Sequence, residues 1–152
     1  MRIEIAYVTP RRGRLKSAPA QALLEDFRTR AARYTPVQTA AYDTEAALLA
    51  SVEKAAARSP VPLILLDSRG EALTSETIAQ RLGRLRDAGT QQVTMAIGPA
   101  DGWSAAALGR ASFRLSFGAI TLPHELALVV LAEQVYRALA ILAGHPYHSG
   151  HS

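Results

Sequence analysis

Short, largely apolar runs that alternate with longer segments of helical periodicity constrain the fold of this chain more than any other feature. The clearest is the continuous run Leu63-Ile64-Leu65-Leu66, and the stretch from Val93 to Ile97, with Thr94 as its one polar residue, is a second. Runs of this length without polar alternation are typical of strands buried on both faces, which occur in parallel sheets covered by helices on either side. We therefore predict an α/β fold, a sandwich of helices around a parallel sheet.

The other segments continue this alternation. Ile3, Ile5 and Tyr7 alternate with Glu4 and Ala6, which is typical of a strand. The pattern predicts two further strands, at 36–42 and 113–117, and a loop at 9–17. It also predicts four helices, at 19–33, 44–57, 74–89 and 124–143.

The last predicted helix, from His124 to Ala143, is apolar nearly all round. The only interruptions are Glu125, Glu133, Gln134 and Arg137. Such a helix offers more apolar surface than a five-stranded sheet covers, which points to a partner subunit. Since homodimers bury helical faces in contacts between like surfaces, we expect a homodimer.

Length and composition are typical of a single globular domain. With 152 residues, 49% of them apolar, the chain has enough apolar surface to fold as one domain over residues 1–152. The absence of cysteine excludes disulfide frameworks, cysteine zinc sites and thiol catalysis. No apolar run approaches the roughly 20 residues of a membrane span, and the N-terminus has no signal-like segment. We therefore expect a soluble cytoplasmic protein without a membrane partner.

The positive charge is concentrated at the N-terminus. Residues 1–34 hold eight cations and three acids, a net charge of +5, whereas the rest of the chain holds nine cations and ten acids, a net charge of −1. Arginine, which suits bidentate phosphate contacts, supplies 15 of the 17 cations. A basic loop suits a phosphate backbone, while a solvated arginine-rich loop is the simpler alternative. The candidate RNA-binding residues are those of its densest stretch, Arg11, Arg12, Arg14 and Lys16.

The usual nucleotide-binding and hydrolase motifs are absent. The sequence contains no G-x-G-x-x-G, no G-x-x-x-x-G-K-[ST] and no G-x-S-x-G. Three glycine-containing turns instead follow predicted strands, at 66–70, 97–102 and 115–124. Sheets of α/β proteins bind ligands at the carboxyl ends of their strands, and glycine lets a ligand approach the backbone closely. These turns are the candidate ligand site.

A histidine-containing tail follows the last helix. His145, His148 and His151 have a spacing that a metal site can use, but Pro146 does not fit a helical array and no carboxylate is close in sequence. We therefore expect no metal. Tyr147 and His148 are instead suited to stacking on a base or to moving a proton.

Three segments together resemble a known family. They are 115–126, which ends in Thr121-Leu122-Pro123-His124-Glu125-Leu126, then Leu131-Ala132-Glu133-Gln134-Val135-Tyr136-Arg137-Ala138, then His145-Pro146-Tyr147-His148. The combination is similar to the ribosomal RNA large subunit methyltransferase H (RlmH, formerly YbeA) family of the SPOUT superfamily. The match is strong over residues 61–148, where Leu66-Asp67, Ile97-Gly98 and Gly102 also fit. Over the N-terminal half it extends to length and element order only.

The resemblance implies a fold, a partner and a reaction that periodicity does not show. The implied fold is an α/β domain with a deep C-terminal trefoil knot, a rare exception to the rule that chains do not thread loops. The implied assembly is a homodimer through the knot and the last helix, with S-adenosylmethionine held in a bent pose by the knot loops. The implied reaction is methylation of N3 of a pseudouridine in helix 69 of 23S rRNA, position 1915 in the usual rRNA numbering, on the ribosome.

The resemblance also implies roles for individual residues. Tyr147 and His148 match the tail that reaches the active site across the dimer. There His148 is the favoured assistant of N3 deprotonation, with a structural tail histidine as the alternative. His124 is expected to cap or orient its loop, and Glu133 and Arg137 are expected to pair along the helix. The cofactor-binding loops of the family match Leu66, Gly98, Leu115, Ser116, Phe117, Gly118, Ala119, Ile120 and Leu122.

Three residues depart from the family pattern. Pro99 stands where a second glycine is usual, and proline has no backbone donor, so a cofactor contact through that amide is lost. Leu128 and Ser149 stand where the family carries cations near the active site, and Arg2 or the loop cations are candidates to compensate. Two alternatives stay open: a SPOUT enzyme on another RNA, and a catalytically weakened dimer that binds RNA or cofactor without transferring methyl.

Overall fold

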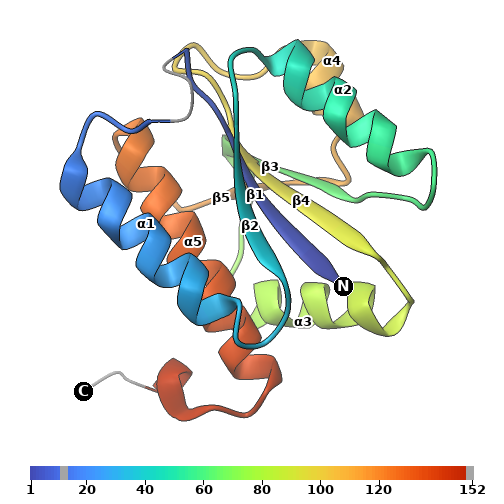
Figure 1. Ribbon diagram of the computed structural model, residues 1–152, viewed down its shortest axis with the longest axis vertical. Helices are drawn as coiled ribbons and strands as arrows, with labels where there is room; N and C mark the ends of the chain where they lie inside the picture. The colour runs from blue at the N-terminus through green and yellow to red at the C-terminus, as the bar shows by residue number, and fades with distance from the viewer. Residues whose placement is uncertain (11–13, 150–152) are drawn as a thin grey trace.

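Five parallel strands form a single sheet in the computed structural model, which describes residues 1–10 and 14–149. The order across the sheet is β2-β1-β4-β3-β5, and every neighbouring pair is parallel (Figure 1). The predicted α/β fold with a parallel sheet is therefore confirmed. The strands are β1 (Arg2–Val8), β2 (Val37–Tyr42), β3 (Leu63–Ala72), β4 (Gln92–Ile97) and β5 (Phe113–Ser116). The helices are α1 (Ala18–Ala31), α2 (Glu45–Ala56), α3 (Ser75–Asp87), α4 (Ala105–Arg110) and α5 (His124–Leu142), followed by the 3-10 helix η1 (Pro146–Ser149).

The two faces of the sheet belong to two separate apolar cores, because successive side chains of a strand point to opposite faces. Ile3 and Ile5 of β1 join the core formed with α1, α3 and α5. Ala6 and Val8 join the core formed with α2 and α4 on the other face. Figure 1 shows the same division, with α1 and α5 on one side of the strands and α2 and α4 on the other. The result is a sandwich of three layers.

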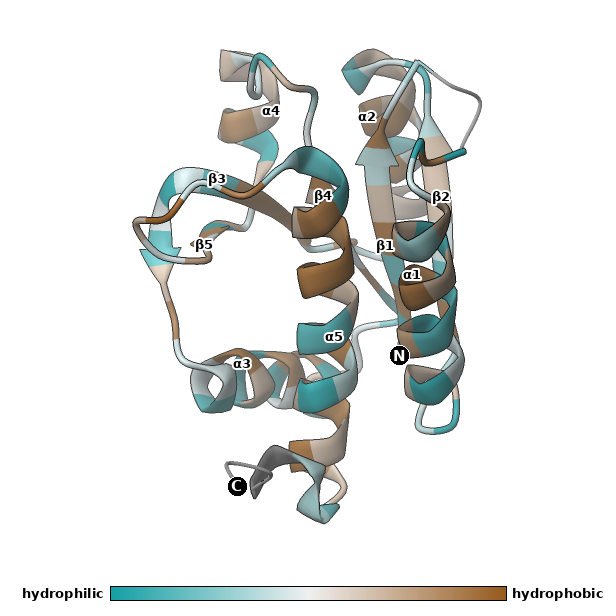
Figure 2. Ribbon diagram, turned by 90° about the vertical axis from the view of Figure 1, so that its left-hand side faces the viewer, coloured by the Kyte–Doolittle hydropathy of each residue, from teal (hydrophilic) through white to brown (hydrophobic). Residues whose placement is uncertain are grey.

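Helix α5 lies between α1 and α3, and these neighbours change the argument for a partner subunit (Figure 2). Its residues Leu128 and Leu131 have no exposed surface within a single chain. The chain itself therefore covers most of the apolar surface of α5, so that surface alone is no reason for a dimer. The described large apolar side chains that do stay exposed are Leu23, Ile120 and Leu126, with 46%, 71% and 46% of their surface accessible.

Two local features differ from the sequence-based expectation. Helix α4, capped by Ser104, has six residues, too few for a helical period to stand out in the sequence. Strand β3 does not end at Asp67 but continues to residue 72, because Leu66 and Glu71 both pair with Leu115 across an irregularity. The predicted turn at 66–70 is therefore a bulge inside a strand, not the end of one.

Candidate functional site

A cavity of about 520 Å³ lies where β4 and β5 end and β3 bulges. Its volume lies within the range of small-molecule sites in proteins, roughly 300–1,000 Å³. All three predicted turns line it, because parallel strands run toward the same edge of the sheet. The structure brings together all nine residues that the resemblance matches to cofactor loops: Leu66, Gly98, Leu115, Ser116, Phe117, Gly118, Ala119, Ile120 and Leu122.

The bulge of β3 forms one wall of this cavity. The Arg69 N–H donates to Oδ1 of Asp67 at 3.2 Å, which closes the turn within the bulge. At Gly70 a Cβ would lie 2.7 Å from the backbone C and O of Arg114, so only glycine fits without a shift of backbone. This close approach keeps the start of the bulge, at Leu66, against the cavity.

Gly98 and Trp103 form a second wall after β4. A Cβ on Gly98 would lie 2.6 Å from Cε2 of Trp103, so the indole ring occupies the space that any larger residue needs. The indole N–H donates to the Leu66 carbonyl at 2.9 Å, which fixes the ring between β4 and the bulge of β3. Gly102, with φ of 89°, lets the chain turn back and place the ring there.

The loop after β5 is fixed at its start and open at its tip. The buried Ser116 hydroxyl accepts from the Gly118 N–H at 3.1 Å and donates to the Gly118 carbonyl at 3.2 Å. Gly118 has φ of 101°, a conformation that other residues adopt only with strain. Ile120 at the tip is exposed, so this part of the wall is free to contact a ligand or another chain.

His124 stands where this cavity meets a second groove. It lines both, as do Pro99 and Ala100, and the second groove has a volume of about 1030 Å³. The Nε2 atom of His124 is buried and has no hydrogen-bond partner among the described residues. A buried polar atom without a partner is unfavourable, so it marks a place where a ligand group or water is needed.

The second groove combines apolar side chains with part of the basic loop. Leu23 of α1 and Leu126 of α5 line it together with Lys16. The Glu125 carboxylate accepts the backbone N–H of Lys16 at 2.6 Å and that of Ser17 at 2.9 Å. The end of the basic loop is thereby attached to the first turn of α5.

The structure describes two of the four candidate RNA-binding residues. Arg14 and Lys16 are exposed, whereas Arg11 and Arg12 lie outside the described residues. Arg2 begins β1 and therefore lies at the opposite end of that strand from the loop, where it donates to Oε1 of Gln92 at 2.9 Å. Within its own chain Arg2 therefore does not lie at the cavity.

Comparisons with known proteins establish the family. A family described as predicted SPOUT methyltransferase matches residues 1–148. The chain belongs to this family of SPOUT methyltransferases. The resemblance stated from the sequence is thus confirmed, and the chain is a methyltransferase by family.

Two relatives that align over nearly the whole chain support this assignment. Ribosomal RNA large subunit methyltransferase H of Koribacter versatilis is 42% identical over 151 residues, which cover 99% of this chain and 100% of the relative. The protein of the same name from Maricaulis maris is 37% identical over 158 residues, which cover 97% of this chain and 99% of the relative. The SpoU methyltransferase AviRb of Streptomyces viridochromogenes, solved in complex with AdoMet, matches with a TM-score of 0.48 and 10% identity over 90% of this chain and 59% of that chain.

SPOUT methyltransferases use S-adenosylmethionine, and the cavity of this SPOUT methyltransferase suits that donor. Gly98 lines the cavity with backbone alone, and His124 offers a buried ring nitrogen that has no hydrogen-bond partner in the described part of the chain. Pro99, in contrast, has no N–H to donate. Which of the nine lining residues contact the donor stays a prediction.

The predicted catalytic tail lies far from the cavity of its own chain. Tyr147 packs on Tyr136 with ring centroids 4.5 Å apart, and the Arg137 guanidinium lies 4.9 Å from the Tyr147 ring centroid. Tyr136 follows His124 by 12 residues, which is roughly 18 Å along a helix axis. The backbone of His148 belongs to η1, and its side chain lies outside the described residues.

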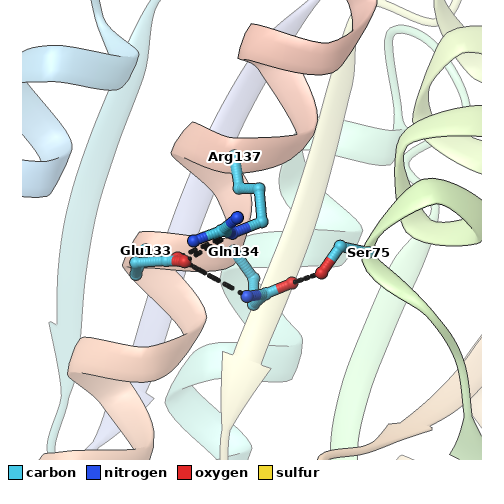
Figure 3. Close-up of polar contacts among 4 residues, drawn as sticks. All are labelled: Ser75, Glu133, Gln134 and Arg137. Carbon is cyan, nitrogen blue, oxygen red and sulfur yellow. Dashed lines mark hydrogen bonds and ion pairs between the residues drawn. The ribbon is translucent and has the colours of Figure 1, made fainter. Parts of the chain in front are cut away.

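A polar network holds the Arg137 side chain beside this tail (Figure 3). Arg137 donates to Oε1 of Glu133 at 2.8 Å, so the predicted pair along the helix is confirmed. Gln134 donates to the same carboxylate at 3.2 Å and accepts from the Ser75 hydroxyl at 2.6 Å, which links α5 to α3. Burial raises the pKa of the Tyr147 hydroxyl most, and the negative charge of Glu133 raises it further, so this hydroxyl keeps its proton at neutral pH.

The remaining departures from the family pattern have different consequences. Leu128 is fully buried in the core and lines neither cavity, so this position affects packing and not the charge at the cavity. The side chain of Ser149 lies outside the described residues. Among the side chains that the structure describes, which exclude that of His148, no group of three metal-ligating residues gathers. Within residues 1–10 and 14–149, no helix has both the length and the hydropathy needed to cross a membrane.

Proposed function

We propose that this SPOUT methyltransferase acts on large-subunit rRNA, and that its target is N3 of a pseudouridine in helix 69 of 23S rRNA. Two relatives that align over nearly the whole chain carry the name ribosomal RNA large subunit methyltransferase H. The observation that carries the proposal is the position of the cavity. Its wall at Pro99, Ala100 and His124 continues into the groove that contains Lys16, so a methyl donor and an RNA phosphate can be bound side by side.

The chemistry asks little of the protein beyond placement and proton transfer. When bound, S-adenosylmethionine supplies an electrophilic methyl group on a sulfonium. The chain must hold the acceptor N3 in line with that methyl group and remove its proton. Tyr147 keeps its proton at neutral pH, which suits it to donate a hydrogen bond or stack on a base rather than to act as the base. The proposal therefore assigns the assisting role in deprotonation to His148.

Two copies of the chain are needed for this arrangement. Tyr147 is held against Tyr136, roughly 18 Å along α5 from His124, so one chain does not bring its own tail to its own cavity. A homodimer solves this if the tail of each chain reaches the cavity of the other. The exposed Leu23 and Leu126 in the groove beside the cavity give such a contact an apolar surface. We further propose that residues 1–152 form one domain with a C-terminal trefoil knot, and that the enzyme works in the cytoplasm, where ribosomes are.

The decisive experiment combines calorimetry with methyl transfer. The purified protein is expected to bind S-adenosylmethionine, and to transfer tritiated methyl to 70S ribosomes at the helix 69 pseudouridine. Ribosomes whose target uridine is not isomerised serve as the control and are expected to accept much less methyl. Binding without transfer to ribosomes, but with transfer to another RNA, would mean a SPOUT enzyme with a different target. Binding of donor and RNA without any transfer would mean a catalytically weakened dimer.

A further inference from the structure

The Glu125 carboxylate connects three elements that are distant in sequence. Its two oxygens accept the backbone N–H groups of Lys16 and Ser17, which precede it by more than 100 residues. Ser17 is the N-cap of α1, since its hydroxyl accepts the Ala20 N–H at 3.2 Å. Glu125 itself is the second residue of α5. One side chain therefore fixes the end of the basic loop, the start of α1 and the start of α5 relative to each other.

A carboxylate suits this place better than any neutral side chain. It offers two acceptor oxygens for two donors that point at it, and its negative charge lies near the positive ends of two helices. Two hydrogen bonds hold the pKa of Glu125 below its usual range: the larger effect comes from the backbone N–H of Lys16 and the smaller from that of Ser17. The contact is therefore charged throughout the physiological range of pH.

The contact leaves the basic side chains available for a ligand. Glu125 accepts a hydrogen bond from the backbone N–H of Lys16 and not from its side chain. Within the described part of the chain the Lys16 ammonium forms no ion pair. Lys16 lines the groove that continues into the cofactor cavity at His124, and Arg14 precedes it on the exposed loop. Glu125 thus fixes the backbone that carries Lys16, two residues after Arg14, beside this groove.

We propose that Glu125 is a positioning residue for methyl transfer. It acts through the backbone of Lys16 and Ser17, and holds Arg14 and Lys16 at the mouth of the cofactor cavity, where they bind phosphates of the substrate RNA. The proposal rests on the proposed function in one respect, that the substrate is RNA. It does not depend on which RNA is methylated.

The first arm of the test asks whether the contact exists in solution. In Glu125→Gln the amide group keeps one acceptor but turns an N–H₂ toward the second backbone donor. The amides of Lys16 and Ser17 are expected to exchange with solvent about tenfold faster in nuclear magnetic resonance spectra of this variant. Glu125→Asp keeps the charge with a shorter reach and is expected to fall between. The matched control is Glu25→Gln, which removes an exposed carboxylate, paired with Arg28, from α1.

The second arm separates positioning from simple helix capping. In Glu125→Gln the KM for ribosomes is expected to rise about tenfold, while kcat and the dissociation constant for S-adenosylmethionine stay within about twofold of the wild type. Glu25→Gln is expected to change none of them. If Glu125 had a merely structural role, Glu125→Gln would lower stability and would change KM, kcat and the dissociation constant for S-adenosylmethionine together, or would change none of the three.

The outcomes decide the proposal whatever the RNA target is. Unchanged amide exchange overturns it, and so does faster exchange with an unchanged KM. If the wild type fails to methylate ribosomes, the proposed target fails, and the dissociation constant for protein-free 23S rRNA takes the place of KM. A tenfold weaker binding of that RNA by Glu125→Gln then supports the positioning role, and equal binding overturns it.

Discussion

Replacement of Gly98 by alanine tests how the wall of the cofactor cavity is built. The new Cβ would lie 2.6, 2.9 and 3.0 Å from three carbon atoms of the Trp103 indole. These distances are shorter than carbon contacts allow, so the ring must move. Movement of the ring breaks or lengthens the 2.9 Å hydrogen bond from the indole N–H to the Leu66 carbonyl. The substitution therefore disturbs two walls of the cavity through one methyl group.

The size of the effect follows from these two contacts. Overpacking of this kind costs about 1–3 kcal/mol, and the loss of one neutral hydrogen bond about 1 kcal/mol. The free energy of unfolding is therefore expected to fall by about 2–4 kcal/mol. Gly109→Ala is the matched control, because Gly109 lies in α4 with nothing within 4 Å of its Cβ position. There the added methyl favours the helix and is expected to raise the free energy of unfolding by about 0.5–1 kcal/mol.

Urea unfolding at equal protein concentration measures the change in the free energy of unfolding for each variant. Calorimetry with S-adenosylmethionine measures how well the cavity still binds the donor. Gly98→Ala is expected to weaken donor binding, and Gly109→Ala to leave it unchanged. A double-mutant cycle with Trp103→Leu isolates the contact, since the smaller side chain leaves room for the methyl group. In that background Gly98→Ala is expected to cost at least 1 kcal/mol less. An equal cost in both backgrounds would refute the assignment of the effect to the indole ring.

Two further substitutions address pH dependence and assembly. Burial raises the pKa of Glu4, so the folded chain binds this proton more tightly than the unfolded chain, and the stability gained by protonation is lost as pH rises through the folded pKa. Glu4→Gln keeps an oxygen that accepts from the Tyr42 hydroxyl, and removes the charge. In urea titrations the variant is expected to be more stable than the wild type at neutral pH, and this difference is expected to vanish at about pH 4. Leu126→Asp places a charge on the exposed apolar side of the groove, and light scattering is expected to show monomers with an unchanged circular dichroism spectrum; a stable dimer would place the interface elsewhere.

The parallel sheet could be predicted from the sequence because burial on both faces leaves a direct signature. The run at 63–66 is apolar at every position and the run at 93–97 at every position except Thr94, and both form inner strands of the sheet. The order of the strands has no comparable signature, since the paired residues of β1 and β4 are 90 positions apart in sequence and no local pattern connects them. The bulge of β3 was missed for a similar reason: its glycine is required by the backbone of Arg114, on another strand.

The candidate site divides in the same way. The three turns could be placed together because each follows a predicted strand of the parallel sheet. Two of them follow the ends of β4 and β5, and the third, inside β3, follows its buried run at 63–66. The roles of Trp103 and Glu125 could not be predicted, since the hydrogen-bond partners that define them lie 37 and more than 100 residues away in sequence. A lone tryptophan or glutamate carries no pattern of its own, and its role depends on the tertiary contacts.

The charge of the N-terminal segment is distributed by the fold in a way that limits the RNA contact at each cavity. Of the eight cations counted in residues 1–34, Arg28 and Arg30 pair with Glu25 and Asp26, Arg2 lies at the far end of β1, and Arg33 follows the end of α1. Lys16 of the basic loop lines the groove beside the cavity, and the loop holds four cations by sequence. Each contacted phosphate of a single strand contributes about −0.7 to the slope of log K against log salt concentration. We therefore expect a slope no steeper than about −3 for the contact at one cavity, measured by filter binding of 23S rRNA between low and moderate salt. A slope much steeper than twice that value would require cations outside the two loops of a dimer, and the loop would then not be the main RNA contact.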